Sequence, residues 1–171
     1  MGDEVFGVLL GDDMIHGDDP GILQLWRCYQ KHQKAVIALM EVPADQTHLY
    51  GIAAGEMLDE RTMRIRKVVE KPKANPPSNM AVIGRYVLPP KVFDLLAKQE
   101  RGVGGEIQLT DALAKLAETD GLIGYRFTGV RHDAGDKLGY VKANLAFALE
   151  RPELREGLLA YMREQLEESS R

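Results

Sequence analysis

Short apolar runs alternate with amphipathic segments along most of this 171-residue chain, and this pattern restricts its fold most strongly. The apolar runs have the length of strands and cover residues 4–10, 35–42, 50–58, 62–70, 80–88 and 121–128. Helical spacing of apolar residues occupies about 20–33, 90–98, 106–118, 136–149 and the segment from Pro152 onward. Strands that alternate with helices predict an α/β layer fold.

Local signals refine this prediction at several places. The run at 4–10 is apolar on both faces, so we expect it to be buried. Asp18 or Asp19 is expected to cap the first helix, which has Pro20 in its first turn. Residues 50–58 and 62–70 are expected to pair across the tight turn that contains Asp59.

Composition narrows the classes of function. The chain is 44% apolar, which is ordinary for a globular protein with a core. Its net charge is -4, so a nucleic-acid-binding surface, which needs a basic face, is not expected. Cys28 is the single cysteine and cannot form an intrachain disulfide, which favours a reducing compartment. The first residues are acidic where a signal peptide would be basic, and no apolar run reaches the roughly 20 residues of a membrane span. We therefore expect a cytoplasmic protein without membrane or nucleic-acid partners.

Two acidic motifs and one basic motif follow predicted strands. The first acidic motif ends the run Val8-Leu9-Leu10-Gly11-Asp12-Asp13, and the second is His132-Asp133-Ala134-Gly135-Asp136-Lys137. The basic motif is Val68-Val69-Glu70-Lys71-Pro72-Lys73. Mg²⁺ takes few protein carboxylates and leaves its other positions to water and substrate phosphates. The three motifs therefore predict a site for a divalent metal and phosphate groups.

Seven motifs in order resemble the bacterial UTP–glucose-1-phosphate uridylyltransferase (UDP-glucose pyrophosphorylase) family, from about Val5 onward. The first four are Leu10-Gly11-Asp12-Asp13, Tyr50-Gly51, Val69-Glu70-Lys71-Pro72-Lys73 and Pro77-Ser78-Asn79. The last three are Ile83-Gly84-Arg85-Tyr86-Val87, Gly105-Glu106-Ile107-Gln108-Leu109-Thr110-Asp111 and 132–140. The resemblance implies a Rossmann-like nucleotidyltransferase fold, with a mixed, mostly parallel sheet and C-terminal helices.

One part of the family pattern has no counterpart here. The family begins with a strand and a Gly-x-Gly-Thr-Arg loop that holds the nucleotide phosphates, and the glycine cluster at 102–105 does not match that loop. We therefore expect the chain to correspond to the C-terminal portion, with a sheet incomplete at its N-terminal side. Residues 1–135 would be the metal- and sugar-phosphate-binding part. Residues 136–171 would be helices that contact another subunit of a homo-oligomer.

The resemblance implies that UDP-glucose and pyrophosphate form from UTP and glucose 1-phosphate with Mg²⁺. Asp12 and Asp133 match the two Mg²⁺ ligands of the family. The simpler interpretation of Asp12 and Asp13 is that both are turn residues, and Asp13 is expected to lie in the turn or behind the ligand. The simpler interpretation of Asp133 is a helix cap, although Asp136 is better placed for capping.

The remaining matched residues concern the sugar phosphate. Lys71 matches the catalytic lysine that holds the phosphate, and Glu70 matches the acid that accepts hydrogen bonds from glucose hydroxyls. Because Lys71 precedes Pro72, its backbone is expected to be extended. Gly51 matches a glycine whose backbone approaches the sugar, and the set is completed by Asn79 and Gly84. The simpler interpretations are a solvated lysine, a surface glutamate and a strand bulge.

Glu106 and Asp111 flank a predicted helix start, where acidic residues are favoured by the helix dipole, and we expect both to be structural. Two alternatives to the uridylyltransferase stay open. The chain could be a non-catalytic module that binds a sugar nucleotide or oligomerises. It could instead belong to a sister nucleotidyltransferase that uses another nucleotide or hexose 1-phosphate.

Overall fold

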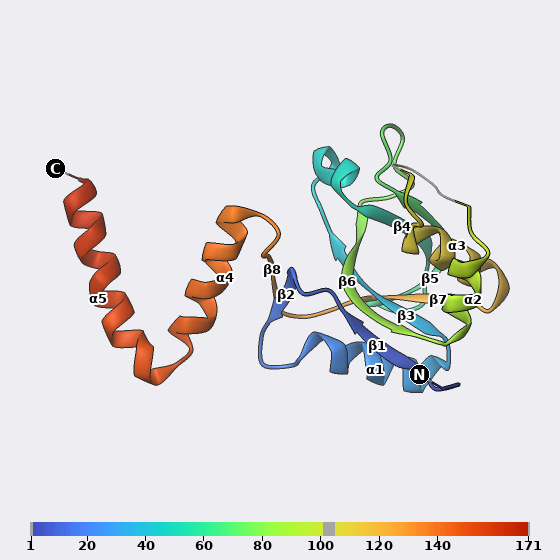
Figure 1. The fold of residues 1–171 in the computed structure, drawn as a ribbon, viewed down its shortest axis with the longest axis horizontal. Coiled ribbons are helices and arrows are strands. Elements are labelled where there is room, and N and C mark those ends of the chain that lie inside the picture. Colours follow the sequence, from blue (N-terminus) through green and yellow to red (C-terminus); the bar gives the residue numbers. More distant parts are fainter. Residues whose placement is uncertain (1, 101–104, 171) are drawn as a thin grey trace. The chain divides into compact units, whose positions relative to one another are not determined.

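The computed structural model describes residues 2–100 and 105–170, so most of the glycine cluster at 102–105 lies outside the described residues. The strands are β1 (Phe6–Leu9), β2 (Asp13–His16), β3 (Ala35–Glu41), β4 (Gly51–Met57), β5 (Thr62–Glu70), β6 (Met80–Leu88), β7 (Leu122–Arg126) and β8 (Val130–Asp133). The helices are α1 (Gly21–His32), the 3-10 helix η1 (Ala44–Leu49), α2 (Lys91–Ala97), α3 (Leu109–Thr119), α4 (Lys137–Leu149) and α5 (Pro152–Ser169). Figure 1 shows these elements along the chain.

The chain divides into two compact units. Unit 1 comprises Met1–Leu10 and Asp19–Thr128, and unit 2 comprises Gly11–Asp18 and Gly129–Arg171. Unit 1 contains the six-stranded sheet, whereas unit 2 contains a two-stranded sheet and the last two helices. No helix in the described part of the chain is long and apolar enough to cross a membrane.

The sheet of unit 1 is mixed, as predicted, in the order β1-β6-β3-β7-β5-β4. β4 also pairs with β6. Five strands therefore form a closed ring of pairings, in the order β6, β3, β7, β5 and β4. The expectation of mostly parallel pairing is not met, because β3–β7 is the one parallel pair among the described strands. The tight turn between β4 and β5 makes them antiparallel, since parallel neighbours need a long crossover.

Two apolar cores cover the two faces of this sheet. Alternate residues of β3 serve different cores, because successive side chains of a strand point to opposite faces. Ile37 and Leu39 join the core formed with α2 and α3, whereas Val36 and Ala38 join the core that contains Leu25 of α1. Figure 1 shows α1 apart from α2 and α3, in agreement with this division. The predicted layers of helix and sheet are therefore present.

β1 is less buried than its apolar sequence predicts. It forms the end of the strand order and pairs with β6 alone among the described strands. Phe6 and Val8 are half-buried, whereas Leu9 is 55% exposed. An edge strand has one neighbour, so its apolar composition does not bring burial on both faces.

The start of α1 also differs from expectation. Pro20 occupies the cap position and no side chain caps the helix there. Asp19 instead forms an ion pair with Arg27, which lies eight residues further along the chain. Its backbone carbonyl accepts a hydrogen bond from Gln24 Nε2. The Asp19 carboxylate therefore pairs with a cation on the helix surface and does not cap the free backbone N–H groups at the start of α1.

Unit 2 contains a feature that the sequence pattern did not predict. β2 and β8 pair as antiparallel strands, with Asp13 opposite Asp133 and His16 opposite Val130. α4 follows β8 closely, and α5 follows α4. The expected apolar stripe of α4 is largely exposed, since Leu138 is 59% exposed and Ala143 is the buried residue of this helix. No residue of α5 in the described range is buried.

Candidate functional site

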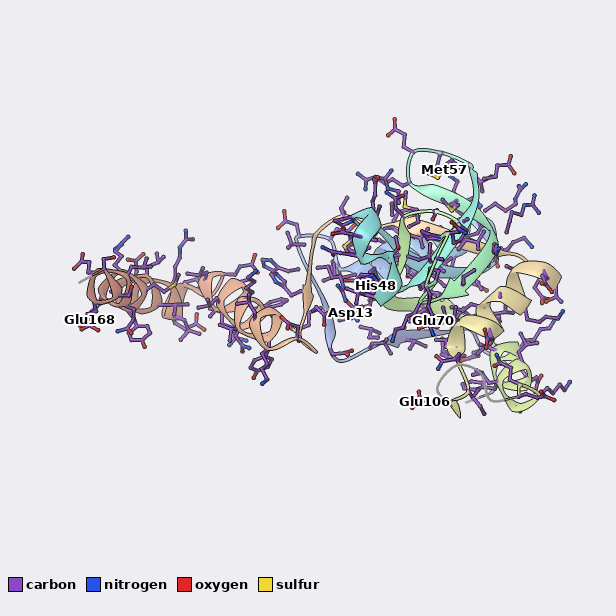
Figure 2. All side chains as sticks on the ribbon, turned by 90° about the horizontal axis from the view of Figure 1, so that it is seen from above. Asp13, His48, Met57, Glu70, Glu106 and Glu168 are labelled. Atoms are coloured by element: carbon purple, nitrogen blue, oxygen red, sulfur yellow. The ribbon has the colours of Figure 1, made fainter. Side chains whose placement is uncertain are left out.

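Three of the residues that match the sugar-phosphate site lie together in unit 1. Gly51 begins β4 and is paired directly with Glu70, the last residue of β5. A Cβ atom on Gly51 would lie 3.2 Å from Glu70 Oε2, so a side chain at this position would crowd the carboxylate. Glu70 is 18% exposed in its side chain. Figure 2 labels Glu70 at this end of the sheet.

Lys71 extends the same group but its backbone differs from the prediction. Its φ angle is +40°, in the left-handed region, whereas the residue before a proline was expected to be extended. Its N–H donates to Tyr50 O at 3.0 Å, which continues the β4–β5 ladder by one further bond. This hydrogen bond holds Lys71 against the strand end, and the Lys71 ammonium lies 3.9 Å from Glu70 Oε1. The lysine is 61% exposed, so a ligand can reach it.

Thr110 is a member of this group that the sequence interpretation missed. Its Oγ1 donates to Glu70 Oε2 at 2.5 Å and would lie 3.4 Å from a Cβ on Gly51. The predicted helix started near Glu106, but α3 begins at Leu109. Thr110 therefore lies in the first turn of α3 instead of in mid-helix. The sequence signal was present in the quoted motif Gln108-Leu109-Thr110-Asp111, where only the acidic residues were considered.

The other two residues expected on the sugar side, Asn79 and Gly84, form hydrogen bonds with other partners. Asn79 Nδ2 donates to Glu41 Oε1 at 3.0 Å, where β3 ends and β6 is about to begin. Gly84 lies in β6 at an irregularity, because Ile37 pairs with Tyr86 and the next residue of β3 pairs with Ile83. The Gly84 carbonyl accepts hydrogen bonds from Leu10 N at 2.9 Å and from the Arg85 guanidinium at 3.0 Å.

The two predicted metal ligands come together in unit 2. Asp12 is an exposed turn residue before β2, and Asp133 ends β8. A Cβ on Gly135 would lie 3.2 Å from Asp133 Oδ1 and 3.3 Å from Asp12 Oδ2, so the two carboxylates face the same small space. The Ala134 N–H donates to Asp12 O at 2.6 Å and ties the two turns together.

This pair of carboxylates fits one divalent cation that keeps other ligands. The described residues contain no group of three or more histidine, cysteine or acidic side chains able to enclose a metal. Mg²⁺ is bound in such cases by one or two carboxylates together with waters and substrate phosphates. The donors present in the described residues therefore suit Mg²⁺ better than a metal that needs a closed protein cage.

Asp13 differs from Asp12 in its surroundings. It is 8% exposed and begins β2, and its Oδ1 accepts a hydrogen bond from Arg131 Nε at 2.5 Å. The Arg131 Nη2 atom donates to Asp133 Oδ2 at 3.1 Å. The position of Asp13 behind the ligands was expected, but Arg131 was not considered because it lies one residue outside the second acidic motif. Figure 2 labels Asp13 on its strand.

The start of α4 fixes the backbone beside Asp133. Asp136 Oδ2 accepts from Gly139 N at 2.8 Å, so Asp136 is the helix cap, as its position led us to expect, and Asp133 is not. Gly139 approaches β8 so closely that a Cβ on it would lie 1.9 Å from Asp133 O. Glycine is therefore needed at this position of the helix.

An aromatic cluster packs α4 on the two-stranded sheet. The rings of His16 and Phe147 lie 4.8 Å apart between centroids, and those of His132 and Phe147 lie 6.2 Å apart. Burial lowers the pKa of His132, and the nearby His16 adds to this effect. The packing of His132 against an aromatic ring supports a structural role for this histidine.

A hollow of about 470 Å³ lies elsewhere in unit 1, between α1 and the turn that joins β4 to β5. Cys28 lines it, and burial raises the pKa of this thiol to about 11. Two of its cations are engaged in ion pairs, Arg27 with Asp19 and Lys31 with Asp59. None of the residues matched to the sugar-phosphate site contributes to this hollow.

Comparison with known proteins agrees with the fold. A family model described as nucleotidyl transferase matches residues 2–149. The chain therefore belongs to the nucleotidyl transferase family.

Within that family, similar proteins include UTP–glucose-1-phosphate uridylyltransferases and UDP-glucose pyrophosphorylases. The UTP–glucose-1-phosphate uridylyltransferase of Bacillus subtilis is 44% identical over 163 residues, which cover 95% of this chain and 56% of that relative. A crystal structure of UDP-glucose pyrophosphorylase complexed with UDP-glucose has a TM-score of 0.82 and 42% identity, over 88% of this chain and 58% of that one. UTP-bound UGPase from Acinetobacter baumannii has a TM-score of 0.81 and 37% identity, over 95% and 57%. The chain thus spans a little over half the length of these relatives.

Proposed function

We propose that this chain is the metal- and sugar-phosphate-binding part of a uridylyltransferase that forms UDP-glucose and pyrophosphate from UTP and glucose 1-phosphate with Mg²⁺. The observation that carries the proposal is the group at the end of β5. Gly51, Glu70 and Lys71 lie together there, with a largely buried carboxylate and an exposed ammonium 3.9 Å from it. This arrangement offers a hydrogen-bond acceptor for sugar hydroxyls and a cation for a phosphate.

Each residue has a role that follows from its chemistry. The Lys71 ammonium is a flexible point charge that binds the phosphate of glucose 1-phosphate and holds it for attack on the α-phosphorus of UTP. The Glu70 carboxylate accepts hydrogen bonds from the glucose hydroxyls, and the backbone of Gly51 lets the sugar come close. Asn79 and Gly84 are proposed as further contacts on the sugar side.

Asp12 and Asp133 are proposed to hold Mg²⁺, which neutralises charge on the phosphates when it is bound. A phosphate oxygen is already a nucleophile, so no general base is required. The transfer needs in-line positioning and charge neutralisation more than covalent participation by the protein. His132 is accordingly given no catalytic role.

The same proposal assigns roles along the chain. Residues 1–135 would carry the metal and the sugar phosphate, and 136–171 would contact a second subunit of a homo-oligomer. Exposed apolar side chains on α4 and α5, such as Leu138 and Leu166, support this role for the last helices. The proposed reaction uses metabolites of the cytoplasm, which is the proposed location.

A second candidate function is a non-catalytic module that binds a sugar nucleotide. It is supported by the group at the end of β5, which can bind a sugar nucleotide whether or not turnover follows. The two candidates share the sugar-phosphate group and differ in turnover.

The test is pyrophosphate release from UTP, glucose 1-phosphate and Mg²⁺ by the purified chain, with the Bacillus subtilis relative as a positive control. Release that is lost in Lys71→Gly supports the enzyme. Binding of UDP-glucose without release, again lost in Lys71→Gly, supports the binding module. Neither release nor binding of UDP-glucose would contradict both candidates.

A further inference from the structure

We infer that Arg131 is a positioning residue for the metal ligand Asp133, an inference that rests on the proposed function. Register places Asp13 directly opposite Asp133 in the β2–β8 pair. Two like charges directly opposite each other on neighbouring strands destabilise the pair. Arg131 lies two residues from Asp133 on β8, and therefore on the same face of the sheet.

The guanidinium divides its donors between the two carboxylates. Arg131 Nε donates to Asp13 Oδ1 at 2.5 Å, and Nη2 donates to Asp133 Oδ2 at 3.1 Å. Both Arg131 and Asp13 are 11% exposed in their side chains, whereas Asp133 is 43% exposed. Asp13 is thus the buried counter-charge that holds the guanidinium, and the guanidinium in turn holds Asp133.

These contacts determine which oxygen of Asp133 is presented to a ligand. Oδ2 is directed toward Arg131, whereas Oδ1 accepts from Gly135 N at 3.1 Å. It is Oδ1 that shares the space beside Gly135 with Asp12 Oδ2. The planar fork of arginine donates to two carboxylates at once in fixed directions, which the flexible ammonium of lysine does less rigidly.

The charge of the cluster leads to the same conclusion. Asp12, Asp13 and Asp133 with Arg131 leave two negative charges, which match one divalent cation. Replacing Arg131 and Asp13 together by neutral residues keeps that charge and leaves no buried ion unpaired. The double variant Asp13→Asn/Arg131→Met therefore separates the orientation of Asp133 from the charge of the site.

The experiment measures Mn²⁺ binding to the 171-residue chain by electron paramagnetic resonance, with circular dichroism melts to establish that each variant is folded. We expect the Kd for Mn²⁺ to rise about 10- to 100-fold in the double variant, the range seen when partners of metal ligands are removed. Arg131→Lys should give an intermediate Kd. Asp133→Ala should abolish binding, and Arg126→Met, which removes a surface arginine of unit 1, should leave it unchanged.

The outcomes separate this inference from the proposed function. A folded double variant with the Kd of the unaltered chain, while Asp133→Ala abolishes binding, would overturn the role of Arg131 and leave the metal assignment intact. If the unaltered chain does not bind Mn²⁺, or if Asp133→Ala binds it equally well, the metal assignment is wrong and the inference fails with it.

Discussion

Lys71 is the residue on which the proposed chemistry depends most, and its backbone allows a sharp test. A non-glycine residue at φ +40° is held in a sparsely populated conformation, which costs on the order of 1–3 kcal/mol. Glycine adopts this conformation without that cost, although it loses more entropy on folding. Lys71→Gly therefore removes the ammonium while the local backbone is kept.

We predict that Lys71→Gly weakens binding of glucose 1-phosphate by about 10-fold or more, the loss expected for a charge-assisted hydrogen bond. The free energy of unfolding should stay the same or rise by up to about 1 kcal/mol. Calorimetric titration and chemical denaturation measure the two quantities. Lys71→Ala is the control. It should lose binding to the same extent but be less stable than Lys71→Gly. Retained binding in both variants would rule out the phosphate role.

Thr110 provides a second prediction at this scale. Thr110→Val removes the donor to Glu70 Oε2 with little change of shape, and it frees the carboxylate to change its orientation. Binding of UDP-glucose should weaken about tenfold, whereas Thr110→Ser, which keeps the hydroxyl, should bind nearly as well as the unaltered chain. If Val and Ser behave alike in the titration, the hydroxyl does not position Glu70.

The sequence motifs named three residues that are neighbours in the structure. Lys71, Glu70 and Gly51 were matched and lie together. Thr110 and Arg131 were not found, because each acts through a partner distant in sequence: 40 residues separate Thr110 from Glu70, and 118 separate Arg131 from Asp13. Such pairings become visible only when the strands are in register.

At the scale of elements, the close approach of α4 to β8 depends on one glycine. Gly139→Ala would place a Cβ 1.9 Å from Asp133 O and must displace either the helix start or the strand end. We predict that the free energy of unfolding of unit 2 falls by about 1–3 kcal/mol, as at other overpacked sites, and that Mn²⁺ binding weakens.

The matched control is Gly157→Ala in the middle of α5, where nothing lies within 4 Å of the new Cβ. Because alanine favours helix over glycine, this change should stabilise α5 by about 0.5–1 kcal/mol and leave Mn²⁺ binding unchanged. Thermal melts followed at a helix band compare the two variants. Equal effects of the two substitutions would contradict the packing account of Gly139.

The turn between β4 and β5 gives a prediction about acid. Asp59 Oδ1 accepts from Arg61 N at 2.9 Å and from Thr62 N at 2.7 Å. The hydrogen bond from Arg61 has the largest effect, followed by those from Thr62, and together they lower the pKa of Asp59 to about 2. A group whose pKa is lowered in the folded state stabilises it above its ordinary pKa, near 4, and loses that effect as the pH falls toward 2.

The difference in Tm between the unaltered chain and Asp59→Asn should therefore be largest above pH 4 and should shrink between pH 4 and pH 2. Melting curves at closely spaced pH values measure it. Glu60→Gln in the same turn serves as the control for removal of a carboxylate. A Tm difference for Asp59→Asn that is independent of pH would mean that the charge of Asp59 does not support the turn.

Among the elements, the strands of the large sheet were predictable because their apolar runs are long and are bounded by turn residues. Met80–Leu88 matches the predicted run at both ends. β2 and β8 were missed, since Asp13–His16 and Val130–Asp133 are four residues each and mix charged with apolar side chains. The sequence pattern also could not predict whether strands pair in parallel or antiparallel. A run of apolar residues indicates a strand but does not identify its neighbour in the sheet.

At the scale of the whole molecule, the fold places the two groups of residues in separate compact units. Glu70 and Lys71 belong to unit 1, and Asp12 and Asp133 belong to unit 2. Each group can therefore be tested by a ligand of its own: Mn²⁺ for the carboxylates, and a sugar phosphate or sugar nucleotide for the group at the end of β5. The similarity to UTP–glucose-1-phosphate uridylyltransferases extends over 95% of the chain and includes both units.

The most direct test of the central claim is an amide chemical-shift titration of the ¹⁵N-labelled chain with UDP-glucose. The account predicts that the amides of Gly51, Lys71 and Thr110 shift most, and that these shifts disappear in Lys71→Gly. Shifts that spare these three amides and gather around the hollow beside Cys28, or shifts that persist unchanged in Lys71→Gly, would contradict the assignment of the sugar-phosphate site.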